Sequence, residues 1–158
     1  VSLNEQGEAC VPDCFWCSWN RREALFKHCV AGGYTRLAFG HHADDVAETT
    51  LMNLPYHANL ETMLPGRPFF DGKFAVSRPL FYVREKDTAQ IAKLAGFDSH
   101  TCTCPHADAS KRRAMKDAVR LLKKDAKYLH QNLWKAARIW WEALGDRPLH
   151  PGEKPPVR

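Results

Sequence analysis

The chain has 158 residues, of which 44% are hydrophobic and 26% charged, proportions typical of a globular domain with its own core. No apolar run approaches the roughly 20 residues that cross a bilayer, so we expect no membrane partner. The net charge is +5, and the six cysteines follow no secretory signal, which favours reduced thiols or metal ligands in the cytoplasm over disulfides.

The first third of the chain predicts an extended entry, a helix and a strand. Residues 1–13 show little periodicity and read as an extended or loop segment. Ser18 is a candidate N-cap for a helix that the glycine pair at 32–33 ends. Residues 35–39 predict a short strand that stops at Gly40. A helix follows within three residues, and open α/β sheets place ligands at such strand-to-helix turns.

The helix after this turn is expected over 43–54, closed by Pro55. Asp44 and Asp45 lie in its first turn, where the helix dipole favours carboxylates, and Glu48 shares a face with Asp45. Acids at this position often only cap a helix. The histidine pair directly before them favours a site instead, because four polar groups then crowd one strand end.

Turn signals in residues 56–73 predict a loop or hairpin over the same edge, followed by a short strand at 74–76. A helix is expected over 84–95. Its expected inward residues are Ile91, Leu94 and Ala95. A tight turn at 102–105 follows.

Two helices are predicted near the end of the chain, one capped by Asp108 or Ser110 and running to Lys127, the other over 129–144. The tail at 146–158 is rich in proline and is expected to be disordered. Residues 111–138 hold ten Lys or Arg against two Asp, a local charge of +8. This stripe suggests a polyanion partner, although a solvated helix face has the same composition.

Cys14 and Cys17 are spaced so that both sulfurs can face one metal or one cluster corner, and three ligand sets compete for them. With Cys10, the spacing resembles the cluster loop of radical SAM enzymes, but no Gly-Gly-Glu segment follows. With Cys102 and Cys104, four thiolates could bind zinc in a non-catalytic nucleic-acid-binding module. Only one residue separates Cys102 from Cys104, however, and this short spacing strains tetrahedral coordination. With one of these last two, three thiolates could hold a [4Fe–4S] cube and leave one iron open.

Four groups of residues occur along the chain: Cys14, Cys17, Ser18, Arg21 and Arg22; Gly40, His41, His42, Asp44, Asp45, Glu48 and Thr49; Arg78, Pro79, Leu80 and Glu85; and Cys104. Their order and approximate spacing, over roughly residues 10–120, resemble those of the tRNA 2-thiocytidine synthetase (TtcA) group of the PP-loop ATP-pyrophosphatase superfamily. The family pairs its last cysteines as C-x2-C-Gly-Ser, whereas this chain has Cys102-x-Cys104-Pro. When Arg112 is aligned with the family's sequence, Cys104 falls at the position of the third ligand. Cys102 remains an alternative ligand.

The resemblance implies an α/β fold: the C-terminal part of an open parallel-sheet PP-loop (adenine nucleotide alpha hydrolase-like) fold, followed by helices. Residues 1–107 would be a partial PP-loop domain and 108–145 basic C-terminal helices. The family's ATP loop, Ser-Gly-Gly-x-Asp-Ser, does not occur in this sequence. We therefore expect a fragment that does not catalyse alone.

The resemblance also implies the reaction, an ATP-dependent tRNA sulfurtransfer in which the C2 oxygen of a pyrimidine is adenylated and sulfur on the open iron displaces AMP. Its cofactors would be a [4Fe–4S] cluster, ATP and Mg²⁺; its partners would be tRNA and a sulfur donor such as a cysteine desulfurase. Whether two copies form a homodimer is left open. The implied catalytic residues are Asp45, Asp44 and Arg21; the cofactor-binding residues Gly40, His41, Asp44, Asp45, Glu48 and Arg78; the cluster ligands Cys14, Cys17 and Cys104; and the tRNA-binding residues Arg112, Arg113, Lys116, Arg120, Lys123 and Lys124.

Overall fold

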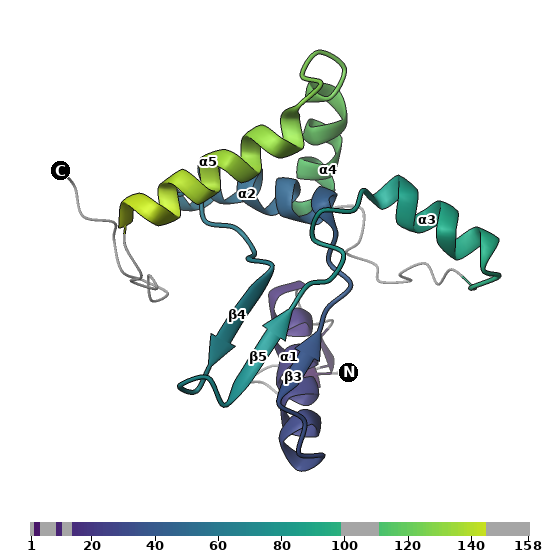
Figure 1. Ribbon diagram of the computed structural model, residues 1–158, viewed down its shortest axis with the longest axis vertical. Helices are drawn as coiled ribbons and strands as arrows, with labels where there is room; N and C mark the ends of the chain where they lie inside the picture. The colour runs from purple at the N-terminus through teal and green to yellow at the C-terminus, as the bar shows by residue number, and fades with distance from the viewer. Residues whose placement is uncertain (1, 4–8, 11–13, 99–110, 145–158) are drawn as a thin grey trace.

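The computed structural model describes residues 2–3, 9–10, 14–98 and 111–144 (Figure 1). Helices and strands are mixed along these ranges, and the parallel strands β3 (Arg36–Ala38) and β5 (Phe74–Ser77) are connected through helix α2 (Ala43–His57), which confirms the α/β class. No helix in the described part of the chain is long and apolar enough to cross a membrane. The predicted turn at 102–105 and the predicted tail at 146–158 lie outside the described residues.

The central sheet has three strands in the order β3 (Arg36–Ala38), β5 (Phe74–Ser77) and β4 (Gly66–Phe69). β3 runs parallel to β5, and β4 runs antiparallel to it. The sheet is therefore mixed, whereas the sequence predicted a parallel one. The reason is local: residues 70–72 all have positive φ, and their turn folds β4 back onto β5 as a hairpin.

Helix α1 (Cys14–Ala31) covers one face of this sheet (Figure 1). Phe26 packs edge-on to Phe74, with ring centroids 5.4 Å apart, and Cys29 is buried beside them. The helix ends at the predicted glycine pair. It begins at Cys14, so the prediction of Ser18 as N-cap is wrong: no glycine or proline interrupts residues 14–31, and the first turn extends back to the cysteine pair.

The first residues also contain structure that the sequence did not predict. Strands β1 (Ser2–Leu3) and β2 (Ala9–Cys10) form a short antiparallel pair, in place of a plain extended or loop entry.

Helix α2 (Ala43–His57) packs against both α4 (Lys111–Leu122) and α5 (Leu129–Leu144). The predicted bounds of α5 are confirmed, but α4 ends five residues early because i→i+3 bonds at residues 124 and 125 close it. α2 runs past Pro55, where the sequence predicted its end. A proline near a C-terminus removes one hydrogen bond, and the left-handed Ala58 ends the helix instead.

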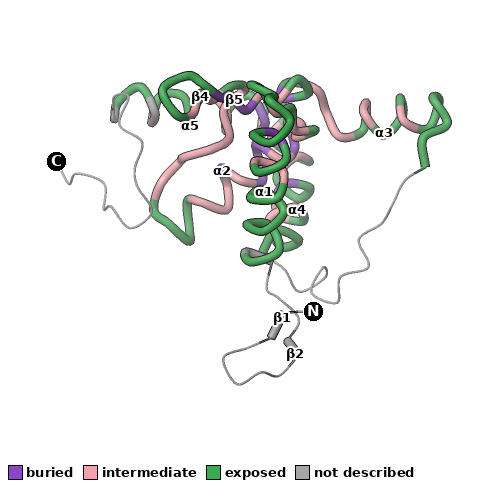
Figure 2. Tube along the Cα trace, turned by 90° about the horizontal axis from the view of Figure 1, so that it is seen from below, coloured by how far each residue is buried: buried purple, intermediate pink, exposed green. Residues whose placement is uncertain are grey.

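Helix α3 (Glu85–Leu94) extends away from the other helices (Figure 1) and contains no buried residue (Figure 2). Ile91 is 60% exposed and Leu94 79%, and Ala95 is exposed too. The prediction that these residues point inward is therefore wrong for the described residues. An amphipathic pattern shows which face of a helix is apolar, but it does not show that a neighbour covers it.

Candidate functional site

The turn between β3 and α2 brings the predicted acidic residues to the carboxyl end of the sheet. His42 is the N-cap of α2: its Nδ1 accepts from the Asp45 N–H (3.3 Å), and its own N–H donates to Asp45 Oδ2 (3.0 Å). The Ala43 N–H donates to the Val83 carbonyl (2.9 Å), which ties the start of α2 to the segment before α3. The histidine thus acts here as half of a capping box.

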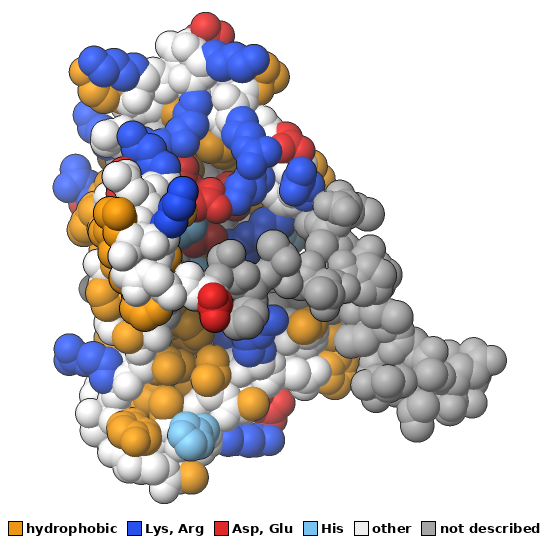
Figure 3. Space-filling model, turned by 90° about the vertical axis from the view of Figure 1, so that its right-hand side faces the viewer, with side chains coloured by type: hydrophobic (Ala, Val, Ile, Leu, Met, Phe, Trp, Pro, Cys, Tyr) orange, Lys and Arg blue, Asp and Glu red, His pale blue; other side chains and the backbone are white. Residues whose placement is uncertain are grey.

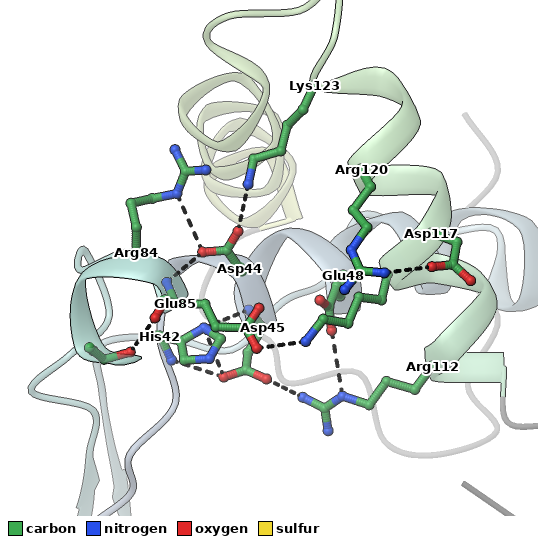
Figure 4. A network of polar contacts seen from close by, with 12 residues as sticks. His42, Asp44, Asp45, Glu48, Arg84, Glu85, Arg112, Asp117, Arg120 and Lys123 are labelled. Atoms are coloured by element: carbon green, nitrogen blue, oxygen red, sulfur yellow. Dashed lines mark hydrogen bonds and ion pairs between the residues drawn. The ribbon is translucent and has the colours of Figure 1, made fainter. Parts of the chain in front are cut away.

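Asp44 is buried, and donors from three other parts of the chain surround its carboxylate (Figure 4). Oδ2 accepts from the Glu85 N–H (2.8 Å) and from Arg84 Nε (3.3 Å). Oδ1 lies 2.9 Å from Lys123 Nζ and 2.8 Å from His130 Nε2. Because an ionised carboxylate has about four acceptor positions, these contacts occupy it fully.

The charge state of Asp44 follows from these contacts. Burial by itself would raise its pKa, but hydrogen bonds from His130, the Glu85 N–H and Lys123 hold the pKa far below its ordinary value. The carboxylate is therefore ionised and can only accept, so Nε2 of His130 must carry a proton. In place of the catalytic or cofactor-binding role predicted for Asp44, this geometry favours a structural one.

Asp45 lies on the opposite side of the same turn and meets Arg112 of α4 (Figure 4). The Arg112 guanidinium pairs with Asp45 and lies 3.7 Å from Glu48 Oε2. Burial raises the pKa of Glu48, although Arg112 and Lys116 oppose the rise. The structure therefore confirms that Asp45 and Glu48 share a face, and it shows that this face lies against a cation.

A polar hollow of about 220 Å³ opens between α2, α3 and α4. Lys116 pairs with Glu85 across it (2.6 Å). Figure 3 shows Lys and Arg side chains crowded on this face, with carboxylates between them. The lining residues are His42, Asp45, Glu48, Glu85, Arg112, Arg113 and Lys116. Among the described residues, no group of three or more His, Cys, Asp or Glu is placed so that it could hold a metal ion.

The predicted basic stripe divides into two groups in the structure. Arg112, Lys116 and Lys123 form the inward group, defined by ion pairs with carboxylates of α2 and α3, although the Arg112 side chain remains 55% exposed. Arg113 and Arg120 both pair with Asp117 of their own helix at the surface, and Lys124 is exposed. The charge available to a polyanion is therefore smaller than the count in the sequence.

His41 precedes the cap and turns toward the segment after β5. Arg78 Nε donates to His41 Nδ1 (3.3 Å), and Arg78 Nη1 donates to the Leu64 carbonyl (2.7 Å). Burial lowers the pKa of His41, and the charges of Arg78 and Arg112 lower it further, while Asp45 opposes them. His41 is thus neutral near pH 7. A Cβ at Gly40 would meet no atom within 4 Å, so space is open beside this backbone.

The predicted cluster ligands are described only in part. Cys17 is an exposed free thiol on α1, one helical turn after Cys14, which begins that helix. The side chain of Cys14 and all of Cys104 lie outside the described residues, as does Cys102. Arg21 is exposed on the next turn of α1.

His130 and Arg84 belong to this site, and sequence reasoning missed both. A signal for His130 exists: it lies on the helical line of Leu133, Trp134 and Ala137, so a histidine continues the buried face of α5. Arg84 carries no comparable signal, because it precedes α3 and reaches Asp44 only through the fold.

Over 101 residues the chain is 46% identical to the tRNA-cytidine(32) 2-sulfurtransferase of Stenotrophomonas maltophilia, a match that covers 63% of this chain and 34% of that protein. It is 36% identical over 122 residues to the enzyme of the same name from Syntrophotalea carbinolica, covering 76% of this chain and 47% of that protein. The chain is a partial-length homologue of tRNA-cytidine(32) 2-sulfurtransferases. It spans between a third and a half of the length of these sulfurtransferases, and the resemblance predicted from its motifs is confirmed over that part.

No protein-family model matches the chain. Among solved structures, the U34-tRNA thiolase NcsA from Methanococcus maripaludis with its [4Fe-4S] cluster matches with a TM-score of 0.70 at 20% identity, covering 93% of this chain and 49% of that one. At this identity the likeness concerns the fold, which is that of part of a tRNA thiolase.

Replacement of Asp44 by Asn should lower the free energy of unfolding by about 3–5 kcal/mol at pH 7, because it removes the charge that Lys123, Arg84 and His130 surround. Since the pKa of Asp44 is lower in the folded state, its ionised carboxylate stabilises the wild type fully above pH 3.8, the ordinary pKa of Asp. This stabilisation is lost progressively as the pH falls below 3.8. Urea unfolding from pH 2 to 7 measures both effects.

The matched control is Asp117→Asn on the exposed surface of α4, for which we expect a change below about 1 kcal/mol. Equal stabilities for the Asp44 and Asp117 variants would contradict the structural role of Asp44.

Proposed function

We propose that the chain is part of an ATP-dependent tRNA 2-sulfurtransferase that replaces the C2 oxygen of a cytidine by sulfur. The observation that carries the proposal is the 46% identity with a tRNA-cytidine(32) 2-sulfurtransferase. It draws further support from the meeting of residues 40–48 with the basic helix α4. In the reaction, the C2 oxygen attacks the α-phosphorus of ATP and pyrophosphate leaves; a sulfide then adds to C2, and AMP leaves with the oxygen.

The finer assignments belong to the same proposal. Residues 1–107 would form part of a PP-loop α/β domain and 108–145 its basic C-terminal helices, in a cytoplasmic enzyme that receives sulfur from a donor such as a cysteine desulfurase. The mixed sheet β3-β5-β4 and the helices packed beside it are compatible with this division.

We propose Cys14, Cys17 and Cys104 as ligands of a [4Fe–4S] cluster. Two features of the described residues fit it: Cys17 is a free, exposed thiol, and the helix that holds it begins three positions earlier, at Cys14. When bound, such a cluster supplies an iron that can hold a sulfide. Arg21, one turn further along the helix, would stabilise negative charge that develops nearby.

After anaerobic reconstitution, we expect roughly four irons and four sulfides per chain, and Cys17→Ala should lose most of both. Cys29→Ala is the matched control, because Cys29 lies on the same helix but is buried in the sheet core. Iron and acid-labile sulfide analysis, with zinc measured in parallel, checks this.

The same analysis on two further variants separates the competing ligand sets. Iron lost in Cys104→Ser but kept in Cys10→Ser supports the proposal. The reverse dependence would indicate a radical SAM cluster, and one zinc without iron would indicate a structural zinc site; either result contradicts the proposal.

ATP and Mg²⁺ are part of the proposal, with Gly40, His41, Asp45, Glu48 and Arg78 facing the nucleotide. The open space beside Gly40 and the neutral His41 are compatible with a ligand there. The described carboxylates form no three-ligand metal group, so we assign no step to Mg²⁺. Of the two acids in the first turn of α2, Asp44 and Asp45, only Asp45 lines the polar hollow. We propose that its carboxylate orients the cytosine during adenylation.

In an enzyme of the relatives' full length, Asp45→Asn should lower the rate of 2-thiocytidine formation by about 100-fold, since Asn keeps a hydrogen-bond acceptor for the His42 N–H but loses the charge. Mass spectrometry of digested tRNA measures the rate. Asp71→Asn, at an exposed position in the hairpin turn, is the control of equal charge change. A variant at Asp45 with the wild-type rate and cluster content would contradict this role.

We propose that α4 and the two lysines after it contact tRNA, with Arg113, Arg120 and Lys124 as the outward group and with Arg112, Lys116 and Lys123 paired to carboxylates of α2 and α3. The outward group remains accessible to phosphates, because its ion pairs are exposed and therefore weak. The inward group instead positions the helix against α2 and α3.

The triple variant Arg113→Gln, Arg120→Gln and Lys124→Gln should weaken binding of an anticodon stem–loop RNA. The slope of log K against log salt should fall by about 2–3, because each of the three cations would otherwise neutralise one phosphate. Fluorescence anisotropy at several salt concentrations measures this. The control triple, Lys73→Gln, Lys86→Gln and Lys93→Gln, changes the same charge on exposed positions elsewhere. If both triple variants lose the same RNA affinity, the basic stripe is only a solvated helix face and the proposed tRNA contact is contradicted.

A further inference from the structure

A second polar hollow, of about 210 Å³, lies between α2, residues 61–64 and the base of the hairpin. Its volume is several times the roughly 30 Å³ that one water molecule occupies, so an anion of several heavy atoms fits. The polar side chains that line it are Thr49, Asn53, Glu61, Thr62, Arg67 and Arg78. The two hollows share no lining residue, so this one is distinct from the hollow at Asp45.

The arginines of this hollow have no carboxylate partner. Among the described residues, no Asp or Glu forms an ion pair with Arg67 or Arg78, whereas Arg84, Arg112 and Arg113 each have one. The Arg67 guanidinium lies over the Phe69 ring, 5.5 Å from its centroid. Glu61 lines the hollow but pairs with neither arginine in this structure.

Arg78 is held firmly in this position. Its bonds to His41 and to the Leu64 carbonyl use two of the five N–H donors of the guanidinium, and three remain for a ligand. Burial lowers the pKa of Arg78, and the positive charges of Arg67 and Arg22 lower it further. Arg67 of β4 and Arg78 after β5 thus line the same hollow from two separate segments.

We propose that this hollow binds a phosphate group, held between Arg67 and Arg78 with the hydroxyl group of Thr49 beside it. The Thr62 hydroxyl lines the hollow too, but it donates its proton to the Val46 carbonyl (3.1 Å). Like charges brought together without a carboxylate repel one another, and a phosphate relieves that repulsion while accepting several charge-assisted hydrogen bonds. The phosphate belongs to a nucleotide or to an RNA backbone, and in this identity the inference rests on the proposed function.

The test uses two probes on the purified chain: pyrophosphate by isothermal titration calorimetry, and a fluorescein-labelled anticodon stem–loop RNA by anisotropy. Arg67→Gln should weaken binding of at least one probe by about tenfold, since the variant cannot make one of the charge-assisted hydrogen bonds. Arg36→Gln, an exposed arginine on β3 outside the hollow, is the matched control and should change it less than about twofold.

Glu61→Gln provides a test of opposite sign, because removal of a negative charge from the lining should tighten binding by about two- to fivefold. Arg78→Gln should weaken binding too, but this variant also loses the side-chain bond to the Leu64 carbonyl, so the Arg67 and Glu61 variants are the decisive ones.

Loss of pyrophosphate binding alone assigns the site to a nucleotide, and loss of RNA binding alone assigns it to the tRNA backbone. No binding of either probe to the wild type, or equal effects of Arg67→Gln and Arg36→Gln, would overturn the inference. Cluster content is a separate readout, so failure here and failure of the sulfurtransferase proposal are distinguishable.

Discussion

A buried carboxylate needs compensation, and the compensation of Asp44 determines how the described helices are arranged. Its donors come from the start of α3, from the segment after α4 and from the first turn of α5. Removing a charge from water is unfavourable by several kcal/mol unless it is paired, so these segments have to meet at the N-terminus of α2. The same contacts place the basic face of α4 opposite Asp45, and the polar hollow results from that placement.

The cations of this protein serve two different purposes. Those facing inward from α4 neutralise carboxylates of α2 and α3, and they hold the hollow in shape. Arg67 and Arg78 have no such partner among the described residues and share a separate hollow. A count of charges along the sequence does not distinguish these groups, since an ion-paired cation and an unpaired one contribute equally to it. Only the unpaired or weakly paired cations are available to phosphates.

The elements with strong local signals were predictable. Gly33, with a φ of 69°, ends α1 because glycine favours the left-handed conformation that closes a helix. The apolar line of 129–144 marks α5 within its observed bounds. The errors concern features decided elsewhere in the chain. Ile91 and Leu94 repeat at helical spacing whether or not another element covers them, and their exposure depends on where α3 lies.

The sequence by itself determined the residue types of the site, their order, and the family they resemble, because motif spacing is a property of the chain alone. Only the tertiary structure decided which partners each residue meets. It separated Asp44 from its neighbour Asp45, since successive side chains at a helix start point to different surroundings: one is buried among His130 and Lys123, and the other faces the hollow. Contacts between residues more than 60 positions apart make this distinction, and local patterns contain no information about such contacts.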